Sequence, residues 1–418
     1  MRCSPWDRRR ALAVKVRDEG TVIRLLAIGN DPTIALPVTV VQGDTHQRQL
    51  KYASILERYH LITQTPQDRP VASQIQLAGN FWVHACGRRG MASYLVDAVR
   101  TGWRIVHEAG IQVVSTQDPF VTGLAGFCIA RRFGLPLSLQ FVANAVDNPF
   151  WLKEKPYYRA LNTLAHWLIA RADTYRVVSE EEKWKLIRLG VPAQRIWNLP
   201  SITDFGRFLA ADGRIIRERY LRGPSAPALA SGDRRLVLSV ARFAPQKDIS
   251  TLLRAFSLLS QNLPGATLLL VGSGSLEQAL RRQVKKLGLE GRVTFAGAVP
   301  YEALPAYYAA CDVLVLSSLY EGNARVLAEA AASARPVVST AVSGASDTIK
   351  EGETGYIVPI GDSQALAGRL GVLLADPVGA KRMGELARSH ILDLYAPEKL
   401  LAGFTDLWDT TAKKRMRG

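Results

Sequence analysis

Residues 312–340 read DVLVLSSLYEGNARVLAEAAASARPVVST, and this stretch decides the fold. Its apolar run at 312–318 predicts a buried strand, its alanine-rich middle predicts a helix, and 335–340 predicts a second strand. A strand, a crossover helix and another strand form the unit from which parallel sheets are built. Two glutamates, Glu321 and Glu329, stand eight residues apart on either side of the expected turn from strand to helix.

The same alternation runs along most of the 418 residues. Strand-like runs lie at 22–29, 36–43, 75–79, 111–116, 136–142 and 174–179, and then at 235–242, 266–272, 293–297, 312–318, 335–340 and 355–359. Continuous β-branched runs separated by helices favour parallel sheets that are covered on both faces. Because the chain is too long for one core, we predict an α/β fold in which two Rossmann-like domains face each other across a cleft.

Changes in composition suggest the domain boundaries, above all the Pro-, Ala-, Ser- and Gly-rich segment that ends near residue 232. We expect an N-terminal extension at 1–20, a first domain at 21–205, a linker at 206–232, a second domain at 233–393 and a C-terminal helix at 394–418. Ligands of such sheets bind beyond the carboxyl ends of the strands, so the shared cleft is the expected site.

The net charge of +16 is carried by lysines and arginines in both halves of the chain. Such a field attracts nucleotide phosphates, nucleic acid or an anionic membrane face. No zinc-finger spacing or RNP-like motif is present, so a nucleic-acid partner is not expected. No apolar run reaches membrane-spanning length, and the start lacks the apolar core of a secretory signal. Four cysteines without paired spacing fit a reducing, cytoplasmic setting.

Two cations mark the end of the strand at 235–242, since Arg242 ends it and Lys247 follows five residues later. A guanidinium and an ammonium near one point can clamp a diphosphate, although two solvated loop charges would give the same pattern. Glu321 and Glu329 can accept hydrogen bonds from the vicinal hydroxyls of two sugar rings. Alternatively, they are a helix-terminal carboxylate and a surface carboxylate.

Glycines mark two turns where backbone amides can face an anion. Gly272 and Gly274 lie in LLLVGSGSLEQAL (268–280), between a predicted strand and a predicted helix. The third glycine of a dinucleotide fingerprint is missing, so a plain tight turn fits this segment equally well. Gly322 and Asn323 present amides at the start of the next predicted helix, where phosphate or sugar oxygens are favoured.

Several segments together resemble the retaining glycosyltransferases of family 4, which have the GT-B fold. The resemblance covers about residues 22–400 and is carried mainly by VARFAPQKD, VGSGS, VTFAGAVP, YYAACDVLVLSSLYEGNARVLAEAAASARPVVSTAVSGASDTI and GETGYIVP. It implies that a UDP- or GDP-linked sugar is transferred to an acceptor hydroxyl with its anomeric configuration retained. It also implies that the C-terminal helix at 394–418 crosses back to the first domain.

The resemblance assigns roles to individual residues. Arg242 and Lys247 match the pair that binds the diphosphate, and Glu329 matches the carboxylate that holds the nucleotide ribose. The implied catalytic residues are Arg242, Lys247 and Glu321, and the implied donor contacts are Gly272, Gly274, Gly322, Asn323, Ala324 and Glu329. The sequence has no Asp-x-Asp motif and no histidine cluster. We therefore expect a metal-independent transferase of the hexosyltransferase type, with the nucleotide sugar as co-substrate and no cofactor.

The acceptor side departs from the family pattern. Many relatives have a histidine where this chain has Val142, and some have an aspartate where it has Asn144. The acceptor-side candidates are His46, Asp118, Asn144 and Asp147. The departure leaves open a degenerate GT-B protein that binds nucleotide sugar or glycan without turnover. An epimerase or an inverting transferase stays open among the enzymes.

The resemblance points to a glycan or lipid-linked acceptor in the synthesis of a polysaccharide, glycolipid or other cell-surface glycan. The expected location is cytoplasmic, with attachment to the anionic inner face of a membrane as a further option. The stretch FWLKEKPYYRALNTLAHWLIARADTYR (150–176) could lie at such a surface, or it could form an ordinary helix packed on the first sheet.

Overall fold

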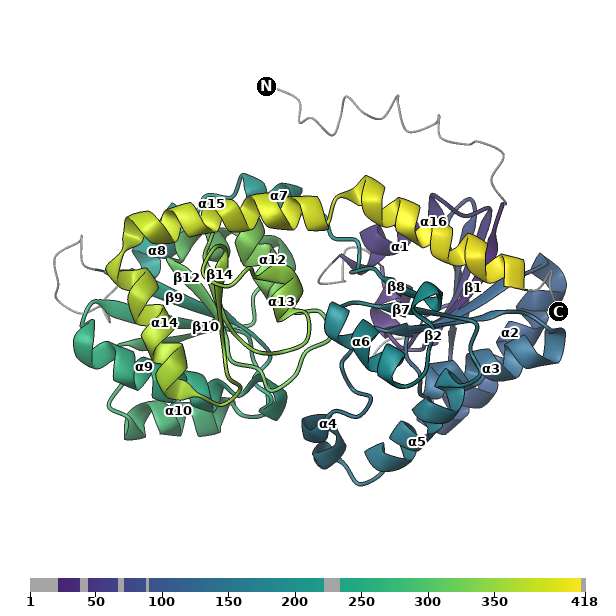
Figure 1. The fold of residues 1–418 in the computed structure, drawn as a ribbon, viewed down its shortest axis with the longest axis horizontal. Helices are drawn as coiled ribbons and strands as arrows, with labels where there is room; N and C mark the ends of the chain where they lie inside the picture. Colours follow the sequence, from purple (N-terminus) through teal and green to yellow (C-terminus); the bar gives the residue numbers. More distant parts are fainter. Residues whose placement is uncertain (1–21, 38–43, 67–70, 88–89, 222–233, 415–418) are drawn as a thin grey trace, which may run out of the picture.

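The computed structural model describes residues 22–37, 44–66, 71–87, 90–221 and 234–414. The extension expected at 1–20 lies outside these residues. Two α/β halves lie side by side, and helices α15 (Pro377–Leu394) and α16 (Pro397–Lys414), yellow in Figure 1, run from the second half to the first. The two-domain GT-B fold class is confirmed by two parallel-dominated sheets.

The first half contains an eight-stranded sheet in the order β3-β4-β2-β1-β5-β6-β7-β8. All pairs are parallel except β3 with β4. Its strands are β1 Arg24–Ile28, β2 Arg58–Gln64, β3 Gln74–Ala78, β4 Phe81–Cys86, β5 Val113–Thr116, β6 Leu137–Phe141, β7 Thr174–Val177 and β8 Ile196–Asn198. Its helices are α1 Thr45–Ala53, α2 Met91–Ala109, α3 Val121–Phe133, α4 Pro149–Glu154, α5 Tyr158–Ile169 and α6 Glu180–Arg188.

Three strands of this sheet, β2, β4 and β8, are absent from the sequence prediction. In β2 and β4, buried histidines interrupt the apolar runs, so neither segment looks like a strand buried on both faces. The strand predicted at 36–43 lies mostly outside the described residues. Just before it, residues Pro32–Ala35 form the 3-10 turn η2.

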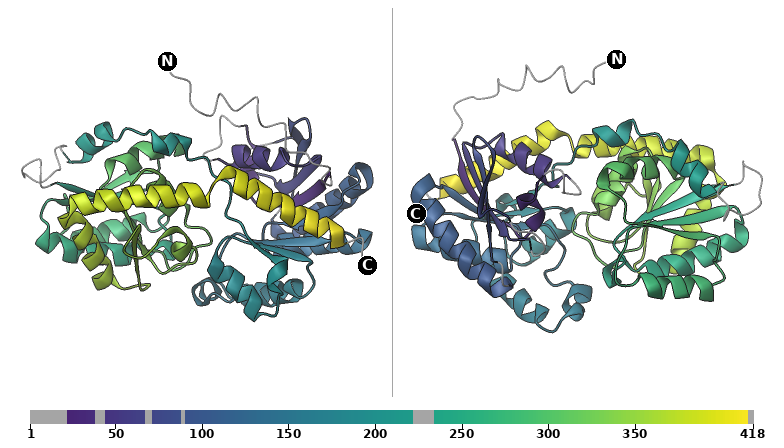
Figure 2. Two further views of the ribbon diagram at one scale, coloured as in Figure 1. Left: turned by 45° about the horizontal axis from the view of Figure 1, so that its top comes forward. Right: turned by 180° about the vertical axis from the view of Figure 1, so that it is seen from behind.

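The second half contains a six-stranded parallel sheet in the order β11-β10-β9-β12-β13-β14. Each of its strands falls within a predicted run: β9 Arg235–Val240, β10 Ala266–Val271, β11 Val293–Gly297, β12 Val313–Leu316, β13 Val337–Thr340 and β14 Gly355–Val358. The helices around it are α7 Gly206–Leu209, α8 Arg214–Leu221, α9 Ile249–Asn262, α10 Glu277–Lys286, α11 Leu304–Ala310, α12 Arg325–Ala332, α13 Ala345–Thr348 and α14 Ser363–Ala375. Figure 2 shows the two sheets side by side from behind.

Apolar side chains cover both faces of each sheet. In the first half, Leu26 and Ile28 pack with α2 and α3, while Leu25 and Ala27 share a core with α16. The second sheet is covered in the same way, by α9 and α14 on one face and by α11 and α12 on the other. Because burial on both faces needs a continuous apolar run, the strands of the second sheet are easy to recognise in the sequence.

The chain passes between the halves twice. After β8 it enters the second half, where Arg217 of α8 forms an ion pair with Asp312 at 3.1 Å. Residues 206–221, expected within a linker, therefore form two helices on the second half, and residues 222–233 lie outside the described chain. At the other passage α16 returns to the first sheet, where Thr411 and Thr174 share a hydrogen bond of 2.7 Å.

The stretch at 150–176 forms α4, α5 and the start of β7. Helix α5 buries Ala165, Leu168 and Ile169 in the core of the first half, and Trp167 packs edge-on against Phe127 of α3 with ring centroids 4.7 Å apart. It is thus a helix packed on the first half. None of the helices that the structure describes combines the length and the apolar character needed to cross a membrane.

Candidate active site

Lys247 and Glu321 meet at the carboxyl edge of the second sheet. Lys247 ends the 3-10 turn η5 (Pro245–Lys247) that follows β9, and Glu321 lies in the loop that follows the neighbouring strand β12. The Lys247 ammonium donates a hydrogen bond to Glu321, and the Ser318 hydroxyl donates to the same carboxylate oxygen at 2.7 Å. Both charged side chains are largely buried, at 19% and 11% exposed, so the pair is poorly screened by solvent.

Backbone contacts fix this pair in place. The Ser317 hydroxyl donates to the carbonyl of Lys247 at 2.9 Å, and the Gln246 side chain donates to the carbonyl of Tyr320 at 2.9 Å. The Leu319 amide donates to the carbonyl of Gln246 at 2.8 Å. The turn after β9 and the loop after β12 therefore form one unit, in which the cation and the carboxylate hold their separation.

Arg242 lies two residues beyond β9 and is exposed. Within the described part of the chain it makes no ion pair, whereas Lys247 does. The structure thus brings together Lys247 and Glu321 and leaves the Arg242 guanidinium open to solvent.

Gly272 and Gly274 pack against the segment that follows β9. A Cβ atom at Gly272 would lie 1.9 Å from the carbonyl oxygen of Ala241, and one at Gly274 would lie 2.4 Å from that of Phe243. Gly272 also has a φ of 134°, which favours glycine. Close approach of two loop backbones is therefore enough to explain both glycines.

The two halves come close together at Gly322. A Cβ atom there would lie 2.1 Å from the carbonyl oxygen of Val142 and 2.5 Å from the Cα atom of Ala143, both in the first half. The next residue, Asn323, accepts a hydrogen bond from the Tyr395 hydroxyl at 3.0 Å, and Ala324 directly precedes α12. The loop at 322–324 thus lies between the halves, at the N-terminus of a helix.

Glu329 lies inside α12 and is only 3% exposed. Its carboxylate accepts hydrogen bonds from the hydroxyls of Tyr308 at 2.7 Å and Tyr301 at 3.3 Å, and the Arg325 guanidinium lies 3.7 Å away. Burial raises the pKa of Glu329, and the positive charge of Arg325 opposes that rise. In the described residues no hydrogen bond or ion pair joins Glu329 to Glu321.

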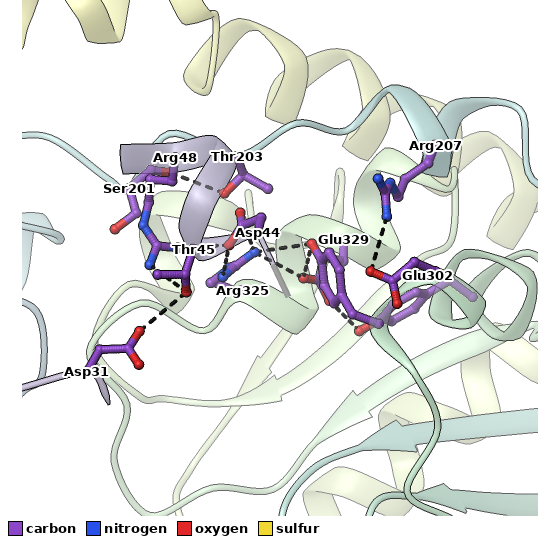
Figure 3. Close-up of polar contacts among 12 residues, drawn as sticks. Asp31, Asp44, Thr45, Arg48, Ser201, Thr203, Arg207, Glu302, Arg325 and Glu329 are labelled. Atoms are coloured by element: carbon purple, nitrogen blue, oxygen red, sulfur yellow. Dashed lines mark hydrogen bonds and ion pairs between the residues drawn. The ribbon is translucent and has the colours of Figure 1, made fainter. Parts of the chain in front are cut away.

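Arg325 extends this cluster into the first half (Figure 3). Its two terminal nitrogens donate to the two carboxylate oxygens of Asp44, at 3.0 and 2.9 Å. Asp44 directly precedes α1 and also accepts from Arg48 at 2.8 Å. The sequence prediction missed Arg325 and Asp44. The spacing of Arg325 and Glu329, four residues apart on a predicted helix, is a signal that could have indicated an ion pair.

His46 is buried, whereas Asp118 is partly exposed. His46 is 5% exposed, and burial lowers its pKa. Its Nε2 atom has no hydrogen-bond partner in the described structure. Asp118 accepts from the backbone amide of Phe120 at 2.8 Å, and its own amide and carbonyl bond with the Thr122 hydroxyl at 3.1 Å. Asp118 thus shapes the turn that enters α3.

Asn144 and Asp147 also have partners within the first half. The Asn144 amide nitrogen donates to Glu181 at 3.2 Å, and its oxygen accepts from Lys185. Asp147 accepts from Asn162 at 2.8 Å and pairs with His166 at 2.9 Å. Val142 precedes this segment and exposes 36% of its surface.

Two family models match the chain. "Glycosyl transferase 4-like domain" matches residues 35–201, and "Glycosyl transferases group 1" matches residues 225–390. This chain belongs to the group 1, family 4 glycosyltransferases. The second match contains Lys247, Glu321, Arg325 and Glu329.

Curated relatives of this glycosyltransferase include two actinobacterial enzymes. A GDP-mannose-dependent alpha-(1-6)-phosphatidylinositol monomannoside mannosyltransferase of Mycolicibacterium smegmatis is 33% identical over 53% of this chain and 58% of its own length. A D-inositol 3-phosphate glycosyltransferase of Nocardia farcinica is 33% identical over 69% of this chain and 66% of its own length. The chain thus spans less than two thirds of the length of either relative.

Solved structures share the fold. Anabaena HepE in complex with UDP superposes with a TM-score of 0.71 at 19% identity, covering 92% of this chain and 99% of that one. Sucrose-phosphate synthase of Thermosynechococcus elongatus gives a TM-score of 0.74 at 24% identity, covering 92% and 98%. In this glycosyltransferase, no three His, Cys, Asp or Glu side chains of the described residues are grouped as a metal site.

Proposed function

We propose that this family 4 glycosyltransferase moves a sugar from a UDP- or GDP-linked donor to an acceptor hydroxyl, with retention and without a metal. One observation carries the proposal: a buried lysine–glutamate pair at the carboxyl edge of the second sheet, where ligands of open α/β sheets bind. The names of relatives that use GDP-mannose, and of HepE bound to UDP, support a nucleotide-sugar donor.

The residues at this edge suit a departing diphosphate. A hydrogen bond holds the backbone of Lys247 in place, and the Arg242 side chain is exposed to solvent. Both side chains can therefore bind phosphate oxygens. A diphosphate gives Lys247 a second anionic partner and leaves Glu321 able to accept from the hydroxyls of the donor sugar. The loop at 322–324 directly precedes α12, so its amides can add hydrogen-bond donors at a helix N-terminus. Stabilising the leaving group in this way lowers the barrier to transfer.

The ribose of the donor would bind at Glu329. A carboxylate has about four acceptor positions, of which the two tyrosine hydroxyls occupy two. The remaining positions can accept a vicinal diol. Because the carboxylate is already oriented by Tyr301 and Tyr308, little ordering is needed when the nucleotide binds.

The acceptor we propose is a glycan or a lipid-linked hydroxyl that meets the enzyme at the cytoplasmic face of a membrane. The phosphatidylinositol mannoside in the name of one relative supports a lipid-linked acceptor. The charge of +16 would attract anionic lipid. We expect binding to vesicles that contain anionic phospholipid, measured by sedimentation, to weaken as salt rises. Binding that ignores salt, or no binding, would contradict this part of the proposal.

Release of UDP or GDP from a panel of donor sugars tests the reaction. We expect slow release by the wild-type chain with at least one donor, in the presence of a chelator. The variant Lys247→Ala should lose about 100-fold or more of this rate, since removing one preorganised donor to a developing anion typically costs about 3–4 kcal/mol. Lys381→Ala, an exposed lysine of α15, is the matched control and should keep the full rate. Equal rates for the two variants would contradict the assignment of Lys247.

Retention needs its own measurement. The anomeric configuration of the freshly released or transferred sugar, followed by NMR, should match that of the donor. Inversion would favour the inverting alternative. Conversion of the sugar without release of nucleotide would favour an epimerase.

The second candidate is a degenerate member that binds nucleotide sugar or glycan without turnover. Val142 favours it, because an apolar side chain stands where many family members have a histidine, next to the contact with Gly322. Tight binding of a donor by calorimetry, with no nucleotide release over many hours, would establish this alternative.

A further inference from the structure

The cluster around Arg325 balances its charges across the two halves of the molecule. Two carboxylates, Asp44 and Glu329, are matched by two guanidiniums, Arg48 and Arg325. Arg325 touches both carboxylates, Asp44 at 2.9 Å and Glu329 at 3.7 Å. Since the carboxylates are only 6% and 3% exposed, solvent cannot replace a lost partner. Loss of the charge of one carboxylate should therefore change how Arg325 interacts with the other.

The hydrogen bonds of the cluster connect the same two carboxylates through Arg325. Arg325 donates to the Tyr301 hydroxyl oxygen at 3.1 Å, and that hydroxyl donates to Glu329 at 3.3 Å. On the other side, the Arg325 fork holds Asp44, which precedes helix α1. Figure 3 shows the guanidinium between the two carboxylates. One side chain thus connects the start of α1 in the first half with the buried carboxylate of α12 in the second.

We infer that Arg325 is a positioning residue that makes nucleotide binding at Glu329 depend on Asp44, a residue of the opposite half. The inference rests on the proposed function, in which Glu329 holds the ribose. With Asp44 in place, the fork draws the guanidinium away from Glu329 and leaves acceptor positions open for the diol. Without the charge of Asp44, Arg325 pairs with Glu329 instead and competes with the ribose.

Removing Arg325 has a different consequence. Glu329 is then buried beside Tyr301 and Tyr308, and no other cation of the described residues forms an ion pair with it, while the charge of Asp44 remains nearby. Burial and the negative charge both raise the pKa of Glu329, so a larger fraction of the carboxyl is protonated than in the wild type at the same pH. A protonated carboxyl accepts fewer hydrogen bonds. Nucleotide affinity should therefore rise with pH in Arg325→Met, because the carboxylate forms as pH increases.

The test is calorimetric titration of UDP and GDP into the full-length chain. We expect Asp44→Asn to weaken the better nucleotide at least 5-fold and Arg325→Met at least 10-fold. The double variant should bind no more weakly than Arg325→Met alone, because both substitutions act through one side chain. Between pH 7 and 9, above the titration of the terminal phosphate near about pH 6, nucleotide affinity should rise with pH more steeply in Arg325→Met than in the wild type.

The control removes another contact between the halves without touching the cluster. Ser343→Ala deletes a 2.7 Å hydrogen bond to Ser179 and should leave nucleotide affinity within 2-fold. If Asp44→Asn proves unstable by thermal unfolding, Asp44→Glu keeps the charge but displaces the fork, and it should also weaken binding. Wild-type affinity in both Asp44 variants, or additive losses in the double variant, would overturn the inference alone. A wild-type chain that binds neither UDP nor GDP would overturn the proposed function as well.

Discussion

His60 and His84 form a buried pair between β2 and β4. Their Nδ1 and Nε2 atoms lie 3.0 Å apart, so one nitrogen must donate and the other accept. The pair stacks at a centroid distance of 5.3 Å, and Arg58 and Arg104 are nearby positive charges. Burial, with a smaller contribution from these charges, lowers the pKa of each histidine to about 4. Protonation of both rings would set two N–H groups against each other, and burial disfavours even the first proton, so the folded state keeps both rings neutral near pH 7.

The first prediction is a loss of stability in mild acid. The unfolded chain takes up protons on these histidines below a pKa of about 6.5, whereas the folded chain does so only near 4. The free energy of unfolding should therefore fall as pH falls from about 6.5 to 4, by roughly 1.4 kcal/mol for each unit of pKa difference. Urea unfolding at pH 7.5 and pH 5 measures this. His84→Gln should reduce the pH dependence of the free energy of unfolding, and the exposed His107→Gln should not. An equal pH dependence in the two variants would contradict the assignment of this effect to the buried histidine pair.

For individual residues, the sequence predicts candidate site side chains better than it predicts the residues that contact them. Lys247 and Glu321 could be proposed because each follows a predicted strand, and carboxyl ends of neighbouring parallel strands meet at one edge. The partners Asp44 and Arg325 lie 281 residues apart, and nothing in their local sequence reports a contact between halves. Asn144 and Asp147 likewise have partners that are distant in sequence and that only the folded chain reveals, such as Lys185 for Asn144, 41 residues away.

Among the elements, helix α16 has the clearest stabilising role. Phe404 is 1% exposed and packs on Tyr52 of α1 with ring centroids 4.6 Å apart. The guanidinium of buried Arg176, from β7, lies 4.8 Å from the centre of the same ring. This last helix therefore closes one face of the first sheet.

The second prediction follows from this packing. Phe404→Ala should lower the free energy of unfolding by about 3–5 kcal/mol, because it leaves a cavity between α16 and the first sheet. Leu386→Ala on α15, where the side chain is 47% exposed, is the control and should stay within about 0.5 kcal/mol of the wild type. Urea titration gives both values. Matching midpoints for the two variants would show that α16 contributes little.

The two sheets differ in how far the sequence predicts them. Every strand of the second sheet falls in a predicted run, because its central strands are buried on both faces and read as continuous apolar stretches such as LLLV in β10. In the first sheet, β2 and β4 are difficult to predict from the sequence, since His60 and His84 place polar atoms in the core. The short β8 carries too little pattern, with three residues, to be recognised.

At the scale of the whole molecule, Gly322 sets how closely the halves approach. A methyl group there meets backbone atoms of Val142 and Ala143, which cannot move aside as a flexible side chain can. The halves must separate to accept it. Because the loop at 322–324 and the first half meet at this point, separation would also disturb the transfer proposed above.

The third prediction is that Gly322→Ala raises the radius of gyration in X-ray scattering and slows donor hydrolysis. The midpoint of its thermal unfolding should change less than the radius of gyration and the rate of hydrolysis, because each half keeps its own core. Gly368→Ala is the matched control: it lies in α14 with open space around the added methyl group, and alanine there should stabilise by about 0.5–1 kcal/mol. A compact, fully active Gly322→Ala would show that the contact is dispensable.

The return of α16 to the first sheet has a consequence for biosynthesis. Nascent chains usually mature from the beginning, domain by domain. Here the 18 residues of α16, which complete the first half, leave the ribosome only after every strand of the second half. The second half can thus fold earlier, while one apolar face of the first half stays uncovered until α16 has been synthesised. A premature stop codon just before α16 would therefore damage the first half of the protein, although it interrupts the chain after the strands of the second half.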